Sequence, residues 1–569
     1  MPYIQAIDRN QMMMCSLDSF VDTKSIARVI DAFVGGLELE ELGFSKSEAA
    51  IEGRPSYDPR CLLKLYLYGS RKSLRSSRKL AEACKLNVDI KWLLGDLEPD
   101  FRTISDFRKD NVEHLKKVFH EFNRKISSVL KQGFKSIDGS KFQANNSKDN
   151  NFTANKLDDR IEWLNQHTDE YLRQLADIDD TEDDTELTGQ FSREELEQKL
   201  KESKERLERY NAYREYMEMN GLAQLSITDA DAKLMKNKNG FMVAYNVQTA
   251  VDSKTHLIND YQMTNQVTDH GLLKSTMDYL KGQNEEEILE VVADKGYNVA
   301  EDMVECLENG IIPHVILPDG QDTYKLEIPY EAMELSEKNI KSKSVENIKK
   351  CLRGGIIPEV YKDVIDDIEV IEKKRFIREE TDKIQKDSRS EEDMKLRAKD
   401  GYFVRDPERN LVYCPAGEVM RQKSIKKNGN IRYANKTACR HCKNRNKCYK
   451  STNEWKEIDF NKDTLEKPNR NWLNMSEGSE KPEVKHRKGH YEIKKIVRLI
   501  LHPDRQKMNQ RMCLSEHPFG TIKRAMDSSY FLLKGKKKVD GEFALFCLGY
   551  NIKRAMSLLG FEKLMEVVA

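Results

Sequence analysis

The sequence lacks any long hydrophobic run. No stretch of about 18 apolar residues, the length that a transmembrane helix needs, occurs in the chain. The N-terminus also lacks the basic start and the apolar segment of a secretory signal. These two absences predict a cytoplasmic protein that makes no contact with a membrane.

The sequence also lacks a net charge. Lys and Arg total 96, and Asp and Glu total 96, which argues against a uniformly basic nucleic-acid-binding protein. Local basic surfaces stay open, and they matter more for binding than the sum. The 569 residues, 38% of them hydrophobic, can bury a sizeable core. This length suits roughly three or four domains of ~150 residues each.

The sequence contains eleven cysteines, an odd number. Seven are scattered in apolar contexts, which is typical of a reducing compartment. The other four form a group, Cys414, Cys439, Cys442 and Cys448. The Cys-x2-Cys pair in this group lets two thiolates share a tetrahedral ion, so the group is a candidate structural Zn²⁺ site. Free cysteines in a small subdomain are the alternative.

A local excess of positive charge surrounds this group. Residues 421–450 contain eleven Lys and Arg and no acidic residue. We expect a basic, Cys-rich subdomain over 401–450 that binds phosphate backbone and gains affinity from counterion release. A solvated basic loop is the alternative.

Residues 1–135 predict a helical domain of the helix-turn-helix type, because short helices are joined by short polar turns. Asp58 and Pro59 suit the start of one helix, and Thr103 suits the start of another. Basic residues gather around the helix between them, among them Arg71, Arg75, Arg78 and Lys79. They are candidates for contacts with DNA phosphates, and the alternative is a solvated helix face.

Alternating and apolar stretches between 137 and 317 predict a sheet. Strands are expected over 137–145, 240–251, 256–263, 287–293 and 311–317. Helices are expected before and after the fourth strand. This order gives a mixed sheet, with three antiparallel strands followed by parallel crossovers.

Two insertions interrupt this sheet. Residues 155–222 carry two helical stripes, and Ser192 and Glu195 form a capping box at the start of the second, so a helical hairpin is expected. The acidic stretch 177–186 suits its solvated tip. The catalytic core is then divided into 136–154 and 223–318. Residues 319–505 form the second insertion, with a helical patch expected at 361–386, and 506–569 form C-terminal helices.

Three acids form a candidate catalytic site. Asp138 and Asp294 lie at carboxyl ends of predicted strands, where the active groups of open α/β sheets collect. Carboxylate oxygens held together suit Mg²⁺, and Mn²⁺ is the substitute. Glu516 is the candidate third acid, in a helix that Ser515 is expected to cap. Lys523 lies seven residues later on the same helical face, and with Arg511 and Arg524 it is a candidate for phosphate contact.

Three motifs resemble the DDE triad of bacterial insertion-sequence transposases. They are Ile-Asp-Gly-Ser-Lys around Asp138, Ala-Asp-Lys-Gly-Tyr around Asp294, and Glu-His-Pro-Phe-Gly-Thr-Ile-Lys-Arg from Glu516. Residues 57–111 and 548–554 also resemble the amino-terminal domain and the last helix of that class. The family signature has a tyrosine seven residues, and an arginine four residues, before the glutamate. This chain has Asn509 and Met512 there, with Arg511 one place off.

The resemblance implies an α/β fold, α+β overall, with an RNase H-like mixed five-stranded sheet and flanking helices. It implies a transposase that binds the inverted-repeat ends of its element as double-stranded DNA. The enzyme would cleave a strand with Mg²⁺ or Mn²⁺ and join the end to target DNA, as at least a homodimer because two ends react. A metal-dependent nuclease without joining and a non-catalytic DNA-binding regulator are the alternatives.

Overall fold

The structure, a computed structural model, describes residues 10–12, 14–45, 56–180, 192–237, 240–283, 286–318, 321–378, 390–426, 429–449, 454–461, 464–473 and 489–569. Two compact units divide the chain. Unit 1 comprises Met1–Ile371 and Lys495–Ala569, and unit 2 comprises Glu372–Lys494.

A mixed sheet in unit 1 has β1 (Lys135–Gln143) at its centre. This strand pairs antiparallel with β5 (Gly240–Asp252) and parallel with β7 (Leu289–Ala293). Beyond these lie β6 (Ile258–Thr264), antiparallel to β5, and β8 (Ile311–Val315), parallel to β7. All five predicted strands are present in the predicted directions. A short strand, β4 (Lys233–Asn237), also pairs with β5, so the sheet has six strands and not five.

Both faces of the sheet are covered, which is why β5 is buried from Ala244 to Asp252. On one face, Ile137 and Ala250 belong to a core that includes α9 (Leu273–Gln283) and α10 (Ala300–Glu308). On the other face, Phe142 and Tyr245 belong to a core shared with the terminal helices. Alternate side chains of one strand therefore serve two different cores.

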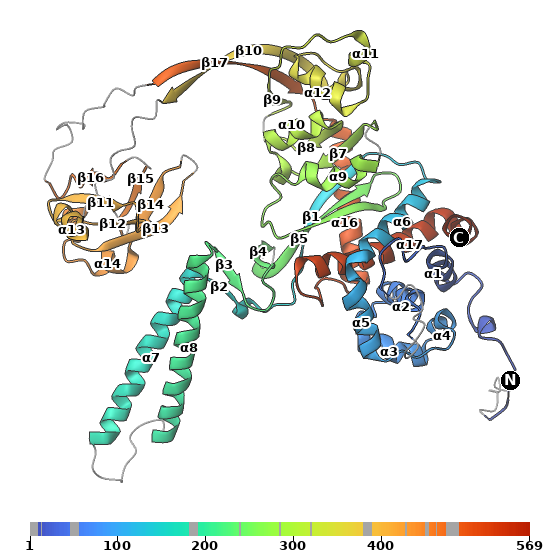
Figure 1. Ribbon diagram of the computed structural model, residues 1–569, viewed down its shortest axis with the longest axis horizontal. Helices are drawn as coiled ribbons and strands as arrows, with labels where there is room; N and C mark the ends of the chain where they lie inside the picture. The colour runs from blue at the N-terminus through green and yellow to red at the C-terminus, as the bar shows by residue number, and fades with distance from the viewer. Residues whose placement is uncertain are drawn as a thin grey trace, which may run out of the picture. The chain divides into compact units, whose positions relative to one another are not determined.

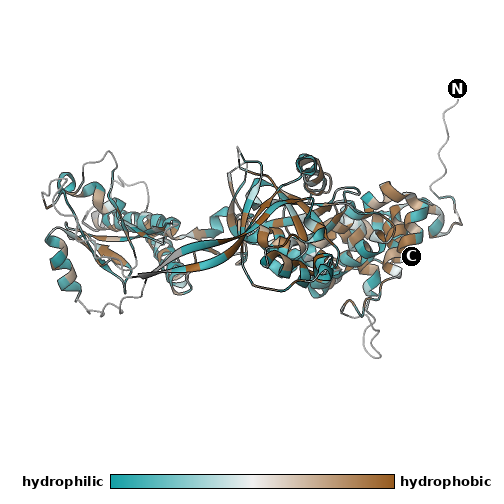
Figure 2. Cartoon of the chain, turned by 90° about the horizontal axis from the view of Figure 1, so that it is seen from above, coloured by the Kyte–Doolittle hydropathy of each residue, from teal (hydrophilic) through white to brown (hydrophobic). Residues whose placement is uncertain are grey.

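The N-terminal helices pack with the last helix in one bundle. They are α1 (Ile26–Gly35), α2 (Pro59–Arg71), α3 (Ser77–Leu86), α4 (Val88–Leu94), α5 (Phe101–Asn111), α6 (Leu115–Ser127) and α17 (Lys536–Val568). Hydrophobic residues, brown in Figure 2, are concentrated in the helices around the C-terminus. Within the described ranges, no helix has the length and hydropathy to cross a membrane.

The caps of these helices test two expectations. Asp58 caps α2, with Pro59 at its first position, as predicted. The start of α5 was wrongly placed at Thr103, because Asp100 caps it: Asp100 accepts hydrogen bonds from the backbone N–H groups of Arg102 and Thr103. A carboxylate three residues earlier satisfies the free N–H groups of the first helical turn, so the helix begins before Thr103.

The first insertion is the predicted helical hairpin. Helices α7 (Ala154–Asp180) and α8 (Arg193–Met219) lie side by side (Figure 1). The capping box of Ser192 and Glu195 opens α8, as predicted. Short strands β2 (Asn151–Thr153) and β3 (Gln224–Ser226) pair next to the hairpin. Most of the acidic stretch 177–186 lies outside the described residues.

The second insertion begins with elements that the sequence did not reveal. Strands β10 (Ile365–Arg378), β17 (Gly489–Leu501) and β9 (Tyr324–Pro329) form a three-stranded sheet, in that order. The helical patch expected at 361–386 was wrong over Ile365–Arg378, which form β10, and its residues 379–386 lie outside the described residues. The isoleucines and the valine of β10 are stiff at χ1 and pack well on a pleated surface. Short helices α11 (Glu337–Ile340) and α12 (Val345–Arg353) lie between β9 and β10.

Unit 2 is a small sheet with short helices. The strand order is β15 (Glu457–Phe460), β14 (Ile431–Ala434), β13 (Val419–Ile425), β12 (Leu411–Tyr413), β11 (Tyr402–Asp406) and β16 (Glu466–Pro468). The helices are α13 (Glu391–Lys399), α14 (Lys436–His441) and α15 (Arg445–Cys448). Phe403, Val412, Tyr433 and Phe460 are buried together in its core.

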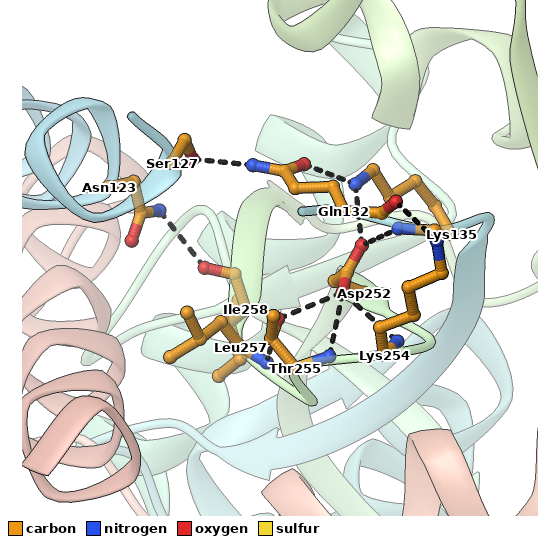
Figure 3. Close-up of polar contacts among 10 residues, drawn as sticks. Asn123, Ser127, Gln132, Lys135, Asp252, Lys254, Thr255, Leu257 and Ile258 are labelled. Atoms are coloured by element: carbon orange, nitrogen blue, oxygen red, sulfur yellow. Dashed lines mark hydrogen bonds and ion pairs between the residues drawn. The ribbon is translucent and has the colours of Figure 1, made fainter. Parts of the chain in front are cut away.

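A buried ion pair fixes the register of β1 and β5 (Figure 3). Nζ of Lys135 lies 2.9 Å from Oδ2 of Asp252, and the two side chains are 4% and 0% exposed. The same carboxylate accepts hydrogen bonds from the backbone N–H groups of Gly133, Lys254 and Thr255. Burial opposes the charge, but Lys135 and these donors outweigh it and hold the pKa of Asp252 below its ordinary value.

The substitution Asp252→Ala tests this pair. Removing one partner of a buried pair leaves the other charge uncompensated, which costs roughly 3–5 kcal/mol. We expect a clear fall in Tm by calorimetry, whereas Asp278→Ala, which removes an exposed carboxylate of α9, should leave Tm nearly unchanged. Equal Tm values for Asp252→Ala and the unmodified chain would contradict this role.

Candidate active site

The two predicted aspartates lie level with each other on neighbouring strands. Ser136 of β1 is paired with Val292 of β7. Asp138 and Asp294 each follow two residues later, in the same parallel direction. Asp138 is 24% exposed, and Asp294, which caps the short helix η4 (Lys295–Tyr297), is 50% exposed. The pairing of the first and fourth predicted strands thus brings the two carboxylates to one place.

A single guanidinium lies between these carboxylates. It belongs to Arg511 of α16 (Arg505–Gly520), which packs across the sheet. Its Nη1 is 4.0 Å from Oδ2 of Asp138, and its Nη2 is 3.6 Å from Oδ1 of Asp294. The Arg511 side chain is only 13% exposed. Arg511, predicted as a phosphate contact, is therefore held by the candidate catalytic acids in this structure.

The environment of Asp138 favours its neutral form. Burial raises the pKa of Asp138 to about 6, and the charge of Asp294 adds to this effect. The guanidinium of Arg511, the Ser515 hydroxyl and the Gly139 N–H oppose the shift. The ordinary value is 3.8. A carboxyl with such a displaced pKa at a strand end is typical of a functional site.

The helix that carries Arg511 begins earlier than expected. Ser515 is not its N-cap, because Asp504 caps α16 and accepts hydrogen bonds from the N–H groups of Gln506 and Lys507. No glycine or proline interrupts residues 505–514, so the helix extends through them. Pro518 consequently lies in the last turn, and a π-helical turn, Thr521–Ala525, follows Gly520.

Glu516 is not gathered with the two aspartates. It is exposed on α16, directly after the buried Ser515. Across the described ranges, no group of three His, Cys, Asp or Glu side chains is arranged to hold a metal ion. The structure therefore brings together Asp138 and Asp294 and leaves the third predicted acid facing solvent.

Lys523 lies against β1 and does not share the face of Glu516. Its Nζ donates hydrogen bonds to Oγ of Ser140 at 2.6 Å and to the carbonyl of Lys141 at 2.8 Å. The π-helical turn changes the angle per residue, so a spacing of seven no longer corresponds to two helical turns. Burial lowers the pKa of Lys523 to about 8, although the charge of Asp138 opposes the shift. Arg524 is exposed.

A further set of polar side chains, which was not predicted from the sequence, adjoins the site. Oδ1 of Asp269 accepts hydrogen bonds from Nδ2 of Asn246 and Nε2 of Gln248, both at 2.8 Å. Gln248 in turn accepts a hydrogen bond from the hydroxyl of Tyr297. Burial and neighbouring carboxylates raise the pKa of Tyr297 well above its ordinary value, which keeps this donor protonated. The available signal was two amide side chains at alternate positions of a mostly apolar strand.

The predicted basic contacts of the N-terminal helices divide into two groups. Arg75 is not free for DNA, because its guanidinium bonds the carbonyls of Asp527 and Tyr530 and pairs with the buried Glu542 at 3.1 Å. Arg71 is half-buried. Arg78 and Lys79 are exposed and remain available.

Acidic residues moderate the basic subdomain of unit 2. Strand β15 carries Glu457 and Asp459, which pair with basic side chains of β13, of the turn after it and of β14. These pairs include Arg432 with both acids, Lys423 with Glu457 and Lys426 with Asp459. The local excess of positive charge is thus smaller than residues 421–450 alone suggested.

The four grouped cysteines lie close together in unit 2. All four are free thiols of intermediate burial. Burial raises the pKa of Cys414, and the charges of Cys439 and Cys442 raise it further. Cys448, whose sulfur accepts a hydrogen bond from Asn469 at 3.3 Å, is coupled to Cys414 and Cys439 in the same way. The thiols do not form a metal-binding group as placed.

The carboxylate oxygens of Asp138 and Asp294 are of a kind that suits a divalent cation. Carboxylates are the ligands that Mg²⁺ prefers, and Mg²⁺ usually keeps several waters, so two carboxylates suffice as a protein contribution. Any cation bound there competes with the guanidinium of Arg511 for the same negative charges.

Metal binding at this pair should depend on pH. The raised pKa of Asp138 means that the acid is protonated below about pH 6, and a cation binds only the carboxylate. We expect the affinity for Mn²⁺ to fall by about tenfold per pH unit below that value and to be nearly constant above it. Electron paramagnetic resonance of free Mn²⁺ would measure this, and an affinity unchanged down to about pH 5 would contradict it.

Two family models match the chain. The model described as "Transposase domain (DUF772)" matches residues 15–110, and that described as "Transposase DDE domain" matches residues 413–556. The second segment contains Glu516 and Lys523, whereas Asp138 and Asp294 lie outside both. No curated protein and no solved structure matches the chain. The two domain matches support an insertion-sequence DDE transposase, which implies DNA substrates and an enzymatic activity in transposition.

Proposed function

We propose that this chain cleaves DNA at the ends of its own element and joins the freed 3′-OH to target DNA, using divalent cations held by Asp138 and Asp294. The observation that carries the proposal is the level placement of these carboxylates on β1 and β7, on either side of Arg511. The strand order β6-β5-β1-β7-β8 supports an RNase H-like core for this site.

Bound Mg²⁺ or Mn²⁺ supplies activation of an attacking oxygen and stabilisation of a leaving oxygen in phosphoryl transfer. The chain contributes the geometry. Asp138 is fixed in the central strand, and Asp294 is fixed at the turn after the neighbouring strand. Arg511 neutralises both acids before the cation enters and can then pair with a DNA phosphate, since a guanidinium suits bidentate phosphate contact.

Glu516 is proposed as the third acid. It follows Ser515, whose hydroxyl bonds Asp138, and a rotation of α16 by about 100°, the angle between successive helical residues, would turn Glu516 toward the pair. DNA contacts are proposed for Lys523 and the exposed Arg524, and for Arg78 and Lys79 of the helix-turn-helix-like domain. Arg71 is a weaker candidate, because it is half-buried. Two element ends react together, so the active complex is proposed to be a homodimer.

Joining separates this proposal from a metal-dependent nuclease, which would cut and stop. A non-catalytic DNA-binding regulator would bind ends and never cut. The raised pKa of Asp138 and its shared guanidinium favour a catalytic site over a structural pair of acids.

The substitution Asp294→Asn tests the catalytic role. It keeps the shape of the side chain and removes the charge that holds the cation. We expect Mg²⁺-dependent cleavage of element-end DNA to fall by a factor of at least about 10³, a loss typical of a group that acts on transition-state charge. Binding of the same DNA should persist, as measured by fluorescence anisotropy.

Asp278→Asn, which removes an exposed charge on α9, provides the matched control and should cleave normally. Undiminished cleavage by Asp294→Asn would refute the assignment. End binding without any cleavage by the unmodified chain would favour the regulator, and cleavage without joining to a second duplex would favour the nuclease.

A structural Zn²⁺ at Cys414, Cys439, Cys442 and Cys448 remains a second proposal. Its support is the closeness of the thiols, together with backbone N–H groups that donate to the sulfur of Cys414 and offset part of the rise that burial causes in its pKa. Donors to sulfur are the usual neighbours of cysteine ligands. The ion would hold α14 and α15 against β12.

Metal analysis tests the zinc site. The chain purified without chelator should contain about one zinc per molecule, the stoichiometry of a four-cysteine structural site. Cys442→Ser should lose that zinc and lower the Tm of unit 2, whereas Cys513→Ser, at an exposed cysteine of α16, should lose neither. Absence of zinc from the unmodified chain would overturn the proposal.

A further inference from the structure

Asp269 occupies an unusual place beside the catalytic acids. It lies in the turn before α9, with an intermediate exposure, and no predicted motif contains it. Gly139 directly follows Asp138, and Gly296 lies two residues after Asp294; both glycines are close to Asp269. A side chain at Gly139 would come within 2.7 Å of Oδ1 of Asp269, and one at Gly296 would come within 3.7 Å of Oδ2.

A chain of hydrogen bonds extends from Asp269 to the turn that carries Asp294. Gln248, fully buried in β5, donates Nε2 to Asp269 and accepts the hydroxyl of Tyr297. Tyr297 ends η4, the short helix that Asp294 caps. Asn246, two residues before Gln248, donates to Asp269 as a second anchor at 2.8 Å. Each step joins a different element: the turn before α9, then β5, then η4.

This series of hydrogen bonds lies against β1, the strand that carries Asp138. Gln248 is the register partner of Gly139. A Cβ at Gly139 would lie 2.5 Å from Nε2 of Gln248, a distance that real contacts essentially never show. Glycine is therefore required there to let the Gln248 amide and the Asp269 carboxylate lie on the backbone next to Asp138. Gly139, directly after Asp138, thus has a packing reason.

We propose that Asp269 is a positioning residue of the catalytic centre: through Gln248 and Tyr297 it holds the turn of Asp294 in register with the strand of Asp138. The inference rests on the proposed function of these two acids. Asp269 acts here as a hydrogen-bond acceptor, since one of its oxygens already receives two amide N–H groups. A hydrogen-bond acceptor and a metal ligand differ in how they tolerate asparagine. The amide oxygen of asparagine can still accept these two bonds, but it lacks the negative charge of a carboxylate ligand.

Three variants test the proposal with Mn²⁺ as the probe. Asp269→Ala and Tyr297→Phe each break the chain of hydrogen bonds, and both should weaken Mn²⁺ binding and raise the Mg²⁺ concentration needed for half-maximal cleavage. Loss of such supporting partners typically costs about 10- to 100-fold in affinity or activity. Asp269→Asn keeps the acceptor oxygen and should restore most of the affinity that Asp269→Ala loses.

Asp278→Ala on α9 is the matched control, because it removes an exposed carboxylate nine residues away in sequence, and it should bind Mn²⁺ normally. Calorimetry of every variant separates a folding defect from a local one: a lowered Tm with unchanged Mn²⁺ affinity would overturn the proposal. A rank order in which Asp269→Asn is as damaged as Asp269→Ala would also overturn it, and would make Asp269 a direct ligand.

Failure of the proposed function would give a different set of results. In that case Asp138→Asn and Asp294→Asn would bind Mn²⁺ and cleave as the unmodified chain does. Normal Mn²⁺ affinity in both Asp269→Ala and Tyr297→Phe, together with its loss in Asp294→Asn, would overturn only the role of Asp269.

Discussion

The position of β1 at the centre of the sheet is the constraint on which the site depends. Both edges of this strand are hydrogen-bonded, to β5 on one side and to β7 on the other. A slip of one residue would turn every side chain to the opposite face and move Asp138 away from Asp294. The buried pair of Lys135 and Asp252 opposes such a slip, because it exists only in one register. The stability of the sheet and the placement of the two carboxylates therefore depend on the same strand register.

Helix α16 presents a stripe of side chains to this sheet at a spacing of four. Lys507 pairs with Glu290 of β7, Arg511 lies between the two aspartates, and Ser515 bonds Asp138. Side chains four apart share a helical face, so these three belong together. Arg511 is one place off the spacing from Glu516 that the family signature has, but it is in register with Ser515. That register explains why the arginine meets the acids while Glu516 faces solvent.

Charge and burial are balanced at this site. Burial pushes Asp138 toward its neutral form and Lys523 toward its neutral form as well, with pKa values of about 6 and about 8. Arg511 limits the first shift, and Asp138 limits the second. Groups poised in this way respond to a cation or a phosphate with small changes in energy, which suits the proposed binding of metal and DNA.

The sequence by itself determined the five strands and the helical hairpin, because these follow from local periodicity. It also determined the directions of the strands and the nearness of Asp138 and Asp294, because the carboxyl ends of neighbouring parallel strands meet at one edge of a sheet. Contacts between residues distant in sequence were decided only by the tertiary structure. No local pattern shows that Glu542 would enclose Arg75, or that β15 would neutralise part of the basic subdomain. The place of Asp269 is of the same kind, since it depends on how three separate elements pack over one glycine.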